Sequence, residues 1–60
     1  MYRVVMLREN FFRAMVALAH PSIFIFSAGT LWMDVALNAG QCNVLANNGI
    51  PFQKELLTTA

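Results

Sequence analysis

His20 has the most distinctive chemistry in this sequence. Its imidazole lies within Ala14–Met33, a stretch without charged side chains. A neutral imidazole in such a place is a good axial ligand for a metal held in a macrocycle, such as haem iron or chlorophyll magnesium. Ala17 is small enough to leave room for a flat ring, and Phe24 and Trp32 are aromatic. His20 is therefore the candidate metal ligand, and the other three residues are candidate cofactor contacts. The alternative is that His20 hydrogen bonds to a neighbouring helix.

Polar residues recur around His20 at intervals of seven. Arg13, His20, Ser27 and Asp34 follow this spacing. Seven residues of α-helix drift by only about 20°, so these side chains would line one narrow stripe if the segment were helical. Lipid offers no hydrogen-bond partners, and such a stripe should face protein, cofactor or water. We expect it to contact other subunits of a membrane protein complex.

Other reactive residues are few. The chain has one His and one Cys, Cys42, which excludes an internal disulfide and a zinc site with four protein ligands. The sequence contains no nucleophile–base pair, no carboxylate dyad and no phosphate-binding loop, so we expect no catalysis. The net charge of +1 gives no indication of a nucleic-acid partner.

A single transmembrane helix is the element expected to position these residues. The uncharged run Ala14–Met33 is bounded by Arg13 and Asp34. As an α-helix it would span about 30 Å, the thickness of the bilayer hydrocarbon. Pro21 is expected to kink this helix. Composition agrees, at 58% hydrophobic and 12% charged residues. Three of the four basic residues precede the run, which predicts a cytoplasmic N-terminus.

The predicted fold is therefore all-α, with three segments. Residues 1–10 form a cytoplasmic interfacial segment, residues 11–39 the transmembrane helix, and residues 40–60 an extracytoplasmic polar loop. Within that loop Asn48-Gly49 is a turn signal, and residues 52–57 are a candidate for a short terminal helix. The expected location is single-pass in a bacterial inner or photosynthetic membrane or a thylakoid, with the lipid bilayer as a partner.

Two stretches in the N-terminal third have residue patterns that resemble those of a known protein family. Met1–Val5 opens with Met, an aromatic residue, a basic residue and a branched pair, and Arg13–Leu18 places a basic residue before an Ala/Leu/Val run. In both, the chain resembles the α-type light-harvesting (antenna) polypeptides of purple photosynthetic bacteria. The resemblance implies a short single-span subunit of a ring-shaped assembly. It also implies bacteriochlorophyll or chlorophyll held by a membrane His, with a carotenoid as a further candidate cofactor.

The chain departs from that family at three places, one of which is Leu31-Trp32, where the family's pigment His is expected. Glu9–Phe12 stands where the family has Asp-Pro before its basic pair, and His20 lies nearer the cytoplasmic end than the family's pigment His. We therefore expect a divergent or accessory, non-catalytic subunit of a photosynthetic pigment–protein complex. The alternative is a structural or assembly subunit of another multi-subunit membrane complex, with no cofactor of its own.

Overall fold

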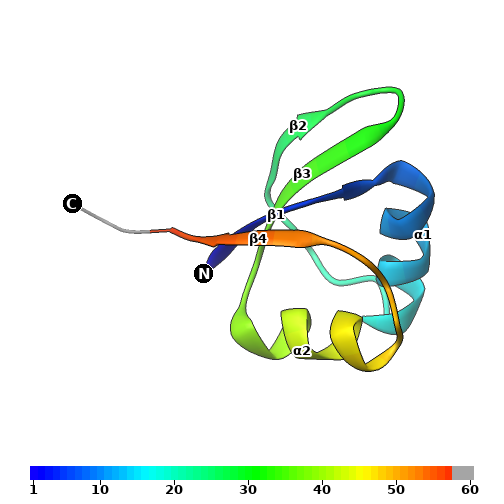
Figure 1. Ribbon diagram of the computed structural model, residues 1–60, viewed down its shortest axis with the longest axis vertical. Coiled ribbons are helices and arrows are strands. Elements are labelled where there is room, and N and C mark those ends of the chain that lie inside the picture. The colour runs from blue at the N-terminus through cyan, green and yellow to red at the C-terminus, as the bar shows by residue number, and fades with distance from the viewer. Residues whose placement is uncertain (58–60) are drawn as a thin grey trace.

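The computed structural model describes residues 1–57, which form four strands and two helices (Figure 1). The strands make one sheet in the order β2-β3-β1-β4, and every neighbouring pair is antiparallel. A β-α-β-β-α-β chain with interleaved strands of this kind is a split βαβ, or ferredoxin-like, arrangement. The elements are, in chain order, β1 (Tyr2–Leu7), α1 (Arg8–Ala17), β2 (Ile25–Ala28), β3 (Trp32–Leu37), α2 (Ala39–Asn47) and β4 (Gln53–Leu56).

In the two central strands, β1 and β3, alternate side chains point toward the core. In β1, Val4 and Met6 are buried, whereas Arg3 on the opposite face is exposed. Successive residues of a strand point to opposite faces, so this pattern directs one face of β1 into the core. β3 contributes three further side chains to the same core: Met33, Val35 and Leu37.

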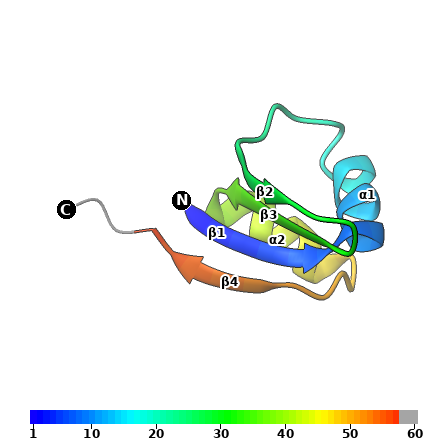
Figure 2. The same cartoon turned by 90° about the horizontal axis from the view of Figure 1, so that it is seen from above.

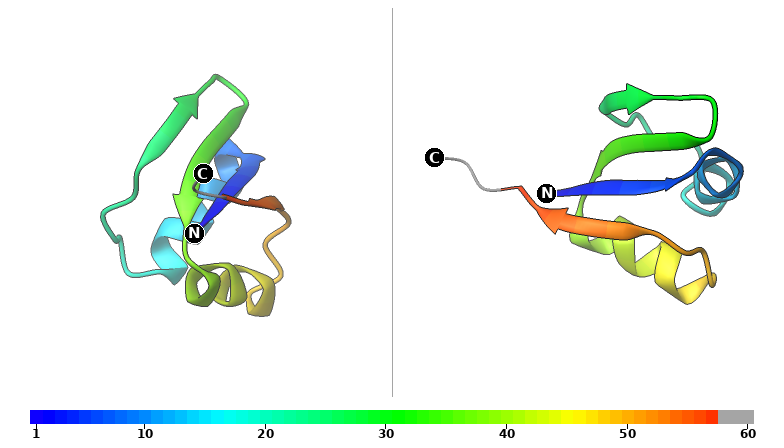
Figure 3. Two further views of the ribbon diagram at one scale, coloured as in Figure 1. Left: turned by 90° about the vertical axis from the view of Figure 1, so that its left-hand side faces the viewer. Right: turned by 45° about the horizontal axis from the view of Figure 1, so that its top comes forward.

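Both helices contribute to that core. Ala14 of α1 and Cys42 and Leu45 of α2 are buried among the strand residues, and Ile50 closes the core after α2. In Figure 2, α2 lies behind the sheet and α1 lies at the end where β1 finishes, and Figure 3 shows the β2–β3 hairpin at the sheet edge. No helix within residues 1–57 covers the opposite face, which we call the open face.

The predicted all-α fold with a transmembrane helix over residues 11–39 is wrong. The helix α1 ends at Ala17, because Ala19 and His20 adopt left-handed backbone conformations, with φ of 60° and 52°. Pro21 follows directly and could not donate a helical hydrogen bond. The rest of the uncharged run forms β2 and the hairpin that leads into β3.

The predicted membrane location is corrected by the same structure. Neither of the helices found within residues 1–57 combines the length and the apolar character needed to cross a bilayer. The single-pass location with a cytoplasmic N-terminus is therefore wrong. Residues 1–10, expected as an interfacial segment, form β1 and the beginning of α1.

The segment 40–60, expected as a polar loop, contains α2 and β4. A capping box starts α2, with Asn38 Oδ1 accepting a hydrogen bond at 2.8 Å from the backbone nitrogen three residues later. Asn48-Gly49 does form the turn that ends α2, and Gly49 has φ of +68°, which glycine adopts at no steric cost. Residues 52–57 contain strand β4 rather than a short helix. The last three residues of the segment, 58–60, lie outside the described residues.

Candidate functional site

The four predicted cofactor residues lie on separate parts of the fold. Ala17 is the last residue of α1 and packs partly against the core, whereas His20 is exposed in the turn that follows. Phe24 precedes β2 and Trp32 begins β3, and both are exposed. The single helix that was expected to carry all four residues does not exist in this fold. Ligation of a chlorophyll-type pigment by His20, and binding of a carotenoid, stay predictions from the sequence.

The seven-residue stripe is also divided among elements. Arg13 lies on α1, where its Nη1 donates a hydrogen bond to Asn10 Oδ1 at 3.4 Å. Ser27 lies on β2 and Asp34 on β3, so the stripe is not one helix face. Contact with partner subunits through such a face therefore loses its geometric basis.

Asp34 forms an ion pair across the open face. Arg3 on the neighbouring strand β1 donates from Nη2 to Asp34 Oδ2 at 2.6 Å, and its Nε lies 2.9 Å from the same oxygen. The hydrogen bond from Arg3 holds the pKa of the Asp34 carboxyl below its usual value. The Arg3 guanidinium also lies over the Phe26 ring, 5.4 Å from its centroid, which connects the ion pair to β2.

The outer edge of β2 is uncharged and, apart from Ser27, apolar. Ile25 pairs with Val35 of β3 and Phe26 lies in a bulge next to it, and the exposed fractions of the two side chains are 45% and 42%. Phe24 packs edge-on against Phe26, with ring centroids 5.1 Å apart. All four residues of β2 are exposed and uncharged. We call Phe24–Ala28 the apolar edge.

The other edge of the sheet has a different character. Strand β4 is also exposed along its length, but it carries Lys54 and Glu55. The Lys54 ammonium lies 4.9 Å from the centroid of the Tyr2 ring, which holds this charge beside β1. Charged side chains on an edge strand discourage pairing with another chain, so the two edges are not equivalent.

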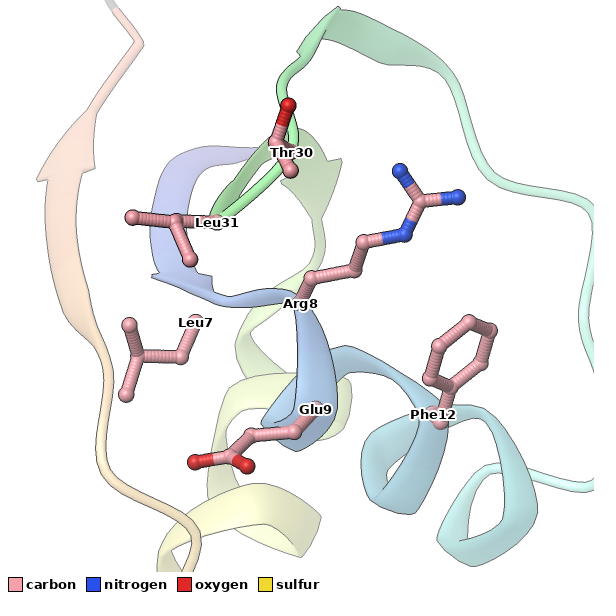
Figure 4. Close-up of a pocket in the computed structure, with 6 residues that line it drawn as sticks. All are labelled: Leu7, Arg8, Glu9, Phe12, Thr30 and Leu31. Carbon is pink, nitrogen blue, oxygen red and sulfur yellow. The ribbon is translucent and has the colours of Figure 1, made fainter.

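A pocket of about 370 Å³ lies where the β2–β3 hairpin meets the beginning of α1 (Figure 4). The backbone nitrogen of Arg8 donates to the carbonyl of Leu31 at 2.8 Å, and Arg8 Nη1 donates to the carbonyl of Gly29 at 3.1 Å. The guanidinium also lies 6.0 Å from the centroid of the Phe12 ring. Six residues line the pocket: Leu7, Arg8, Glu9, Phe12, Thr30 and Leu31.

Groups capable of nucleophilic or metal chemistry are sparse. Cys42 is buried in α2, and burial raises the pKa of its thiol. A buried thiol with a raised pKa is a poor nucleophile, because the thiolate is the reactive form. Within residues 1–57, no three His, Cys, Asp or Glu side chains form a group that could hold a metal ion.

Sequence reasoning missed both the apolar edge and the pocket. The apolar edge had a signal, because Ile23–Phe26 is a short run of β-branched and aromatic residues between Pro21 and Gly29, which is typical of a strand. The pocket had none, since Arg8 and Leu31 meet only after β1 and β3 have paired.

Comparison with known proteins gives no relative for this chain: no protein-family model matches it, and neither the curated proteins nor the solved structures contain a significant match.

Proposed function

We propose that this protein is a non-catalytic assembly module that pairs with a second copy of itself through the apolar edge. The observation that supports this is an edge strand, β2, whose four residues are all exposed and uncharged. The outer side of an edge strand has N–H and C=O groups that can pair with a further strand. Antiparallel pairing of two β2 strands would join the sheets of two copies into one.

We infer a second copy as the partner of this edge because β2 carries no charge. An uncharged strand meets its own copy without the repulsion that like charges produce across neighbouring strands. Ile25 lies opposite buried Val35 and so belongs to the helix-covered face, while Phe26 belongs to the open face near Arg3. Each is a little less than half exposed, so pairing would remove apolar surface from water on both faces of the sheet.

Pairing edge to edge is favoured over packing the two open faces together. The Arg3–Asp34 ion pair lies on the open face, and the exposed fraction of the Arg3 side chain is 48%. Stacking two open faces would desolvate these charges, at a cost of several kcal/mol per ion. Edge pairing through β2 leaves the ion pair in water. The β4 edge is a poorer choice, since it carries Lys54 and Glu55.

The buried state of Cys42 supports the non-catalytic part of the proposal. Its pKa is raised by burial, which lowers the thiolate fraction near neutral pH. The charged groups of the open face, Arg3 and Asp34, bind each other.

Sedimentation velocity of the full chain over a range of concentrations tests the proposal. The wild-type chain should form a discrete dimer. Ile25→Lys should raise the dissociation constant of that dimer at least tenfold, because the lysines of the two copies would lie close together where the β2 strands pair. Leu56→Lys is the matched control, since Leu56 is an exposed apolar residue on the opposite edge strand. This control should leave the dimer unchanged.

Circular dichroism establishes that each variant keeps its fold. If Ile25→Lys unfolds, Ser27→Lys places the charge on the same strand at an exposed residue opposite Asp34. A wild-type chain that stays monomeric would overturn the proposal. Open-ended aggregates in place of a dimer, or equal weakening by the β2 and β4 substitutions, would do the same.

A further inference from the structure

We propose that the pocket between the β2–β3 hairpin and α1 binds a small carboxylate with an apolar body. Its volume of about 370 Å³ lies within the range of small-molecule sites, roughly 300–1,000 Å³. Such sites combine apolar walls with a few polar groups that orient the ligand. The pocket lies at the end of β1. Ligand binding there does not depend on the pairing proposed for β2.

Arg8 supplies the group that would bind the carboxylate. A guanidinium has five N–H donors in a rigid fork, and within residues 1–57 this one hydrogen bonds only through Nη1, to the carbonyl of Gly29. That bond and the neighbouring Phe12 ring hold the side chain in place. The remaining donors include the adjacent Nε–H and Nη2–H, which match the two oxygens of a carboxylate.

The walls around this cation are apolar and unusually exposed. The exposed fractions of the Phe12 and Leu31 side chains are 58% and 68%, and Leu7 completes the apolar lining. Apolar side chains beside a partly free guanidinium suit a ligand that is charged at one end and apolar at the other. Figure 4 shows the Arg8 guanidinium and the Phe12 ring on one side of the pocket, with Leu7 and Leu31 on the other.

The charge of Glu9 favours a ligand with a single negative charge. The Glu9 carboxylate lines the pocket but points away from Arg8 in Figure 4. One guanidinium with one carboxylate at the rim suits a single negative charge better than a doubly charged phosphate, because the second charge would meet Glu9 without a further cation. Thr30 also lines the pocket, but Figure 4 shows its hydroxyl pointing away from Leu31 and from Arg8.

Octanoate is a suitable probe, with 1-octanol as the uncharged control of equal chain length. Titration of the labelled full chain, followed by amide NMR, should show saturable octanoate binding with shifts at Leu7, Arg8 and Leu31. Octanol and the Arg8→Gln variant should each bind about tenfold more weakly or worse, because both lose a charge-assisted hydrogen bond. Arg13→Gln is the matched control on the same helix and should bind octanoate as the wild-type chain does.

A second variant keeps the test decisive if Arg8→Gln disturbs the hairpin. Leu31→Asp changes an exposed side chain, leaves its backbone carbonyl free to accept from Arg8, and places a negative charge in the wall. It should abolish octanoate binding without unfolding the chain. Equal binding of octanol and octanoate, no saturation with the wild-type chain, or unchanged binding by Leu31→Asp would each overturn the proposal.

Discussion

At the scale of single residues, the environment of the Asp34 carboxyl differs most between the sequence-based prediction and the structure. The prediction placed Asp34 at the end of the uncharged run within a membrane helix, whereas in the fold it accepts hydrogen bonds from Arg3 on the neighbouring strand. That contact lowers the pKa of Asp34 in the folded state. Since the unfolded chain lacks the contact, Asp34 binds fewer protons in the folded state than in the unfolded state at the same acidic pH.

Acid should therefore weaken the fold through Asp34. The stabilisation from its lowered pKa is present above the unfolded value of about 3.9 and is lost as the pH falls through the lower folded value. Thermal unfolding between pH 5 and pH 2.5 should show a steeper fall of the melting temperature for the wild-type chain than for Asp34→Asn. Glu55→Gln is the control, since Glu55 affects Arg3 only through charge. Parallel curves for the wild-type chain and Asp34→Asn would contradict this prediction.

The seven-residue spacing of polar side chains could predict a shared face only for a continuous helix. The interval of seven from Arg13 to Asp34 is real in the sequence, but it defines one face only if every residue between them is helical. Two left-handed residues, Ala19 and His20, break that condition. Pro21 indicated a kink or an end of the helix close to His20, because the residue before a proline disfavours the helical conformation. The two left-handed residues themselves leave little trace in composition, since a left-handed backbone is uncommon outside glycine.

At the scale of elements, the end of α1 decides the fold. A helix that continued past Ala17 would consume the residues that form β2. Ala19 and His20 hold φ values of 60° and 52°, a conformation that costs a non-glycine residue roughly 1–2 kcal/mol. Glycine removes most of that cost, although it also increases the entropy of the unfolded chain.

Ala19→Gly should therefore stabilise the protein, by about 0.5–1 kcal/mol after the unfolded-state entropy is included. Ala17→Gly, two residues earlier at the last residue of α1, should destabilise the protein, by at most about 1 kcal/mol. Urea unfolding of the two variants gives opposite shifts of the midpoint if the turn is as described. Destabilisation of similar size by both would show that α1 extends beyond Ala17.

Strand signals were present in the sequence but were outweighed by total hydropathy. Val4–Leu7 is a short apolar run that begins with two β-branched residues, which is consistent with a strand. Ile23–Phe26 is rich in β-branched and aromatic residues. An uncharged stretch of twenty residues has the length of a helix that spans a bilayer. The same length can also hold the end of a helix, a loop and a strand, so length alone does not distinguish the two folds. The Asn48-Gly49 turn was predictable because its signal is local.

At the scale of the whole molecule, protection should follow the position of each strand in the sheet. Strands β1 and β3 each have two neighbours, whereas β2 and β4 each have one within the described chain. Amide hydrogen exchange at low protein concentration should therefore be slowest in β1 and β3 and at least about tenfold faster at the edges.

Raising the concentration distinguishes the two edges. If copies pair through β2, its outward amides should become protected while those of β4 do not. Equal protection of both edges at every concentration would count against the assembly proposed for β2. Slow exchange of β4 amides at low concentration would contradict the assigned strand order.

The central place of β1 has a consequence for how the chain folds as it is synthesised. Its partners are made later: Leu7 pairs with Trp32, 25 positions on, and Tyr2 pairs with Leu56, 54 positions on. While the ribosome is making α1 and β2, β1 therefore has neither of its strand neighbours. Contacts this distant in sequence close slowly compared with helical ones. The order of strands is fixed only after β4 has been made, so a nascent chain that stops earlier leaves β1 as an exposed edge.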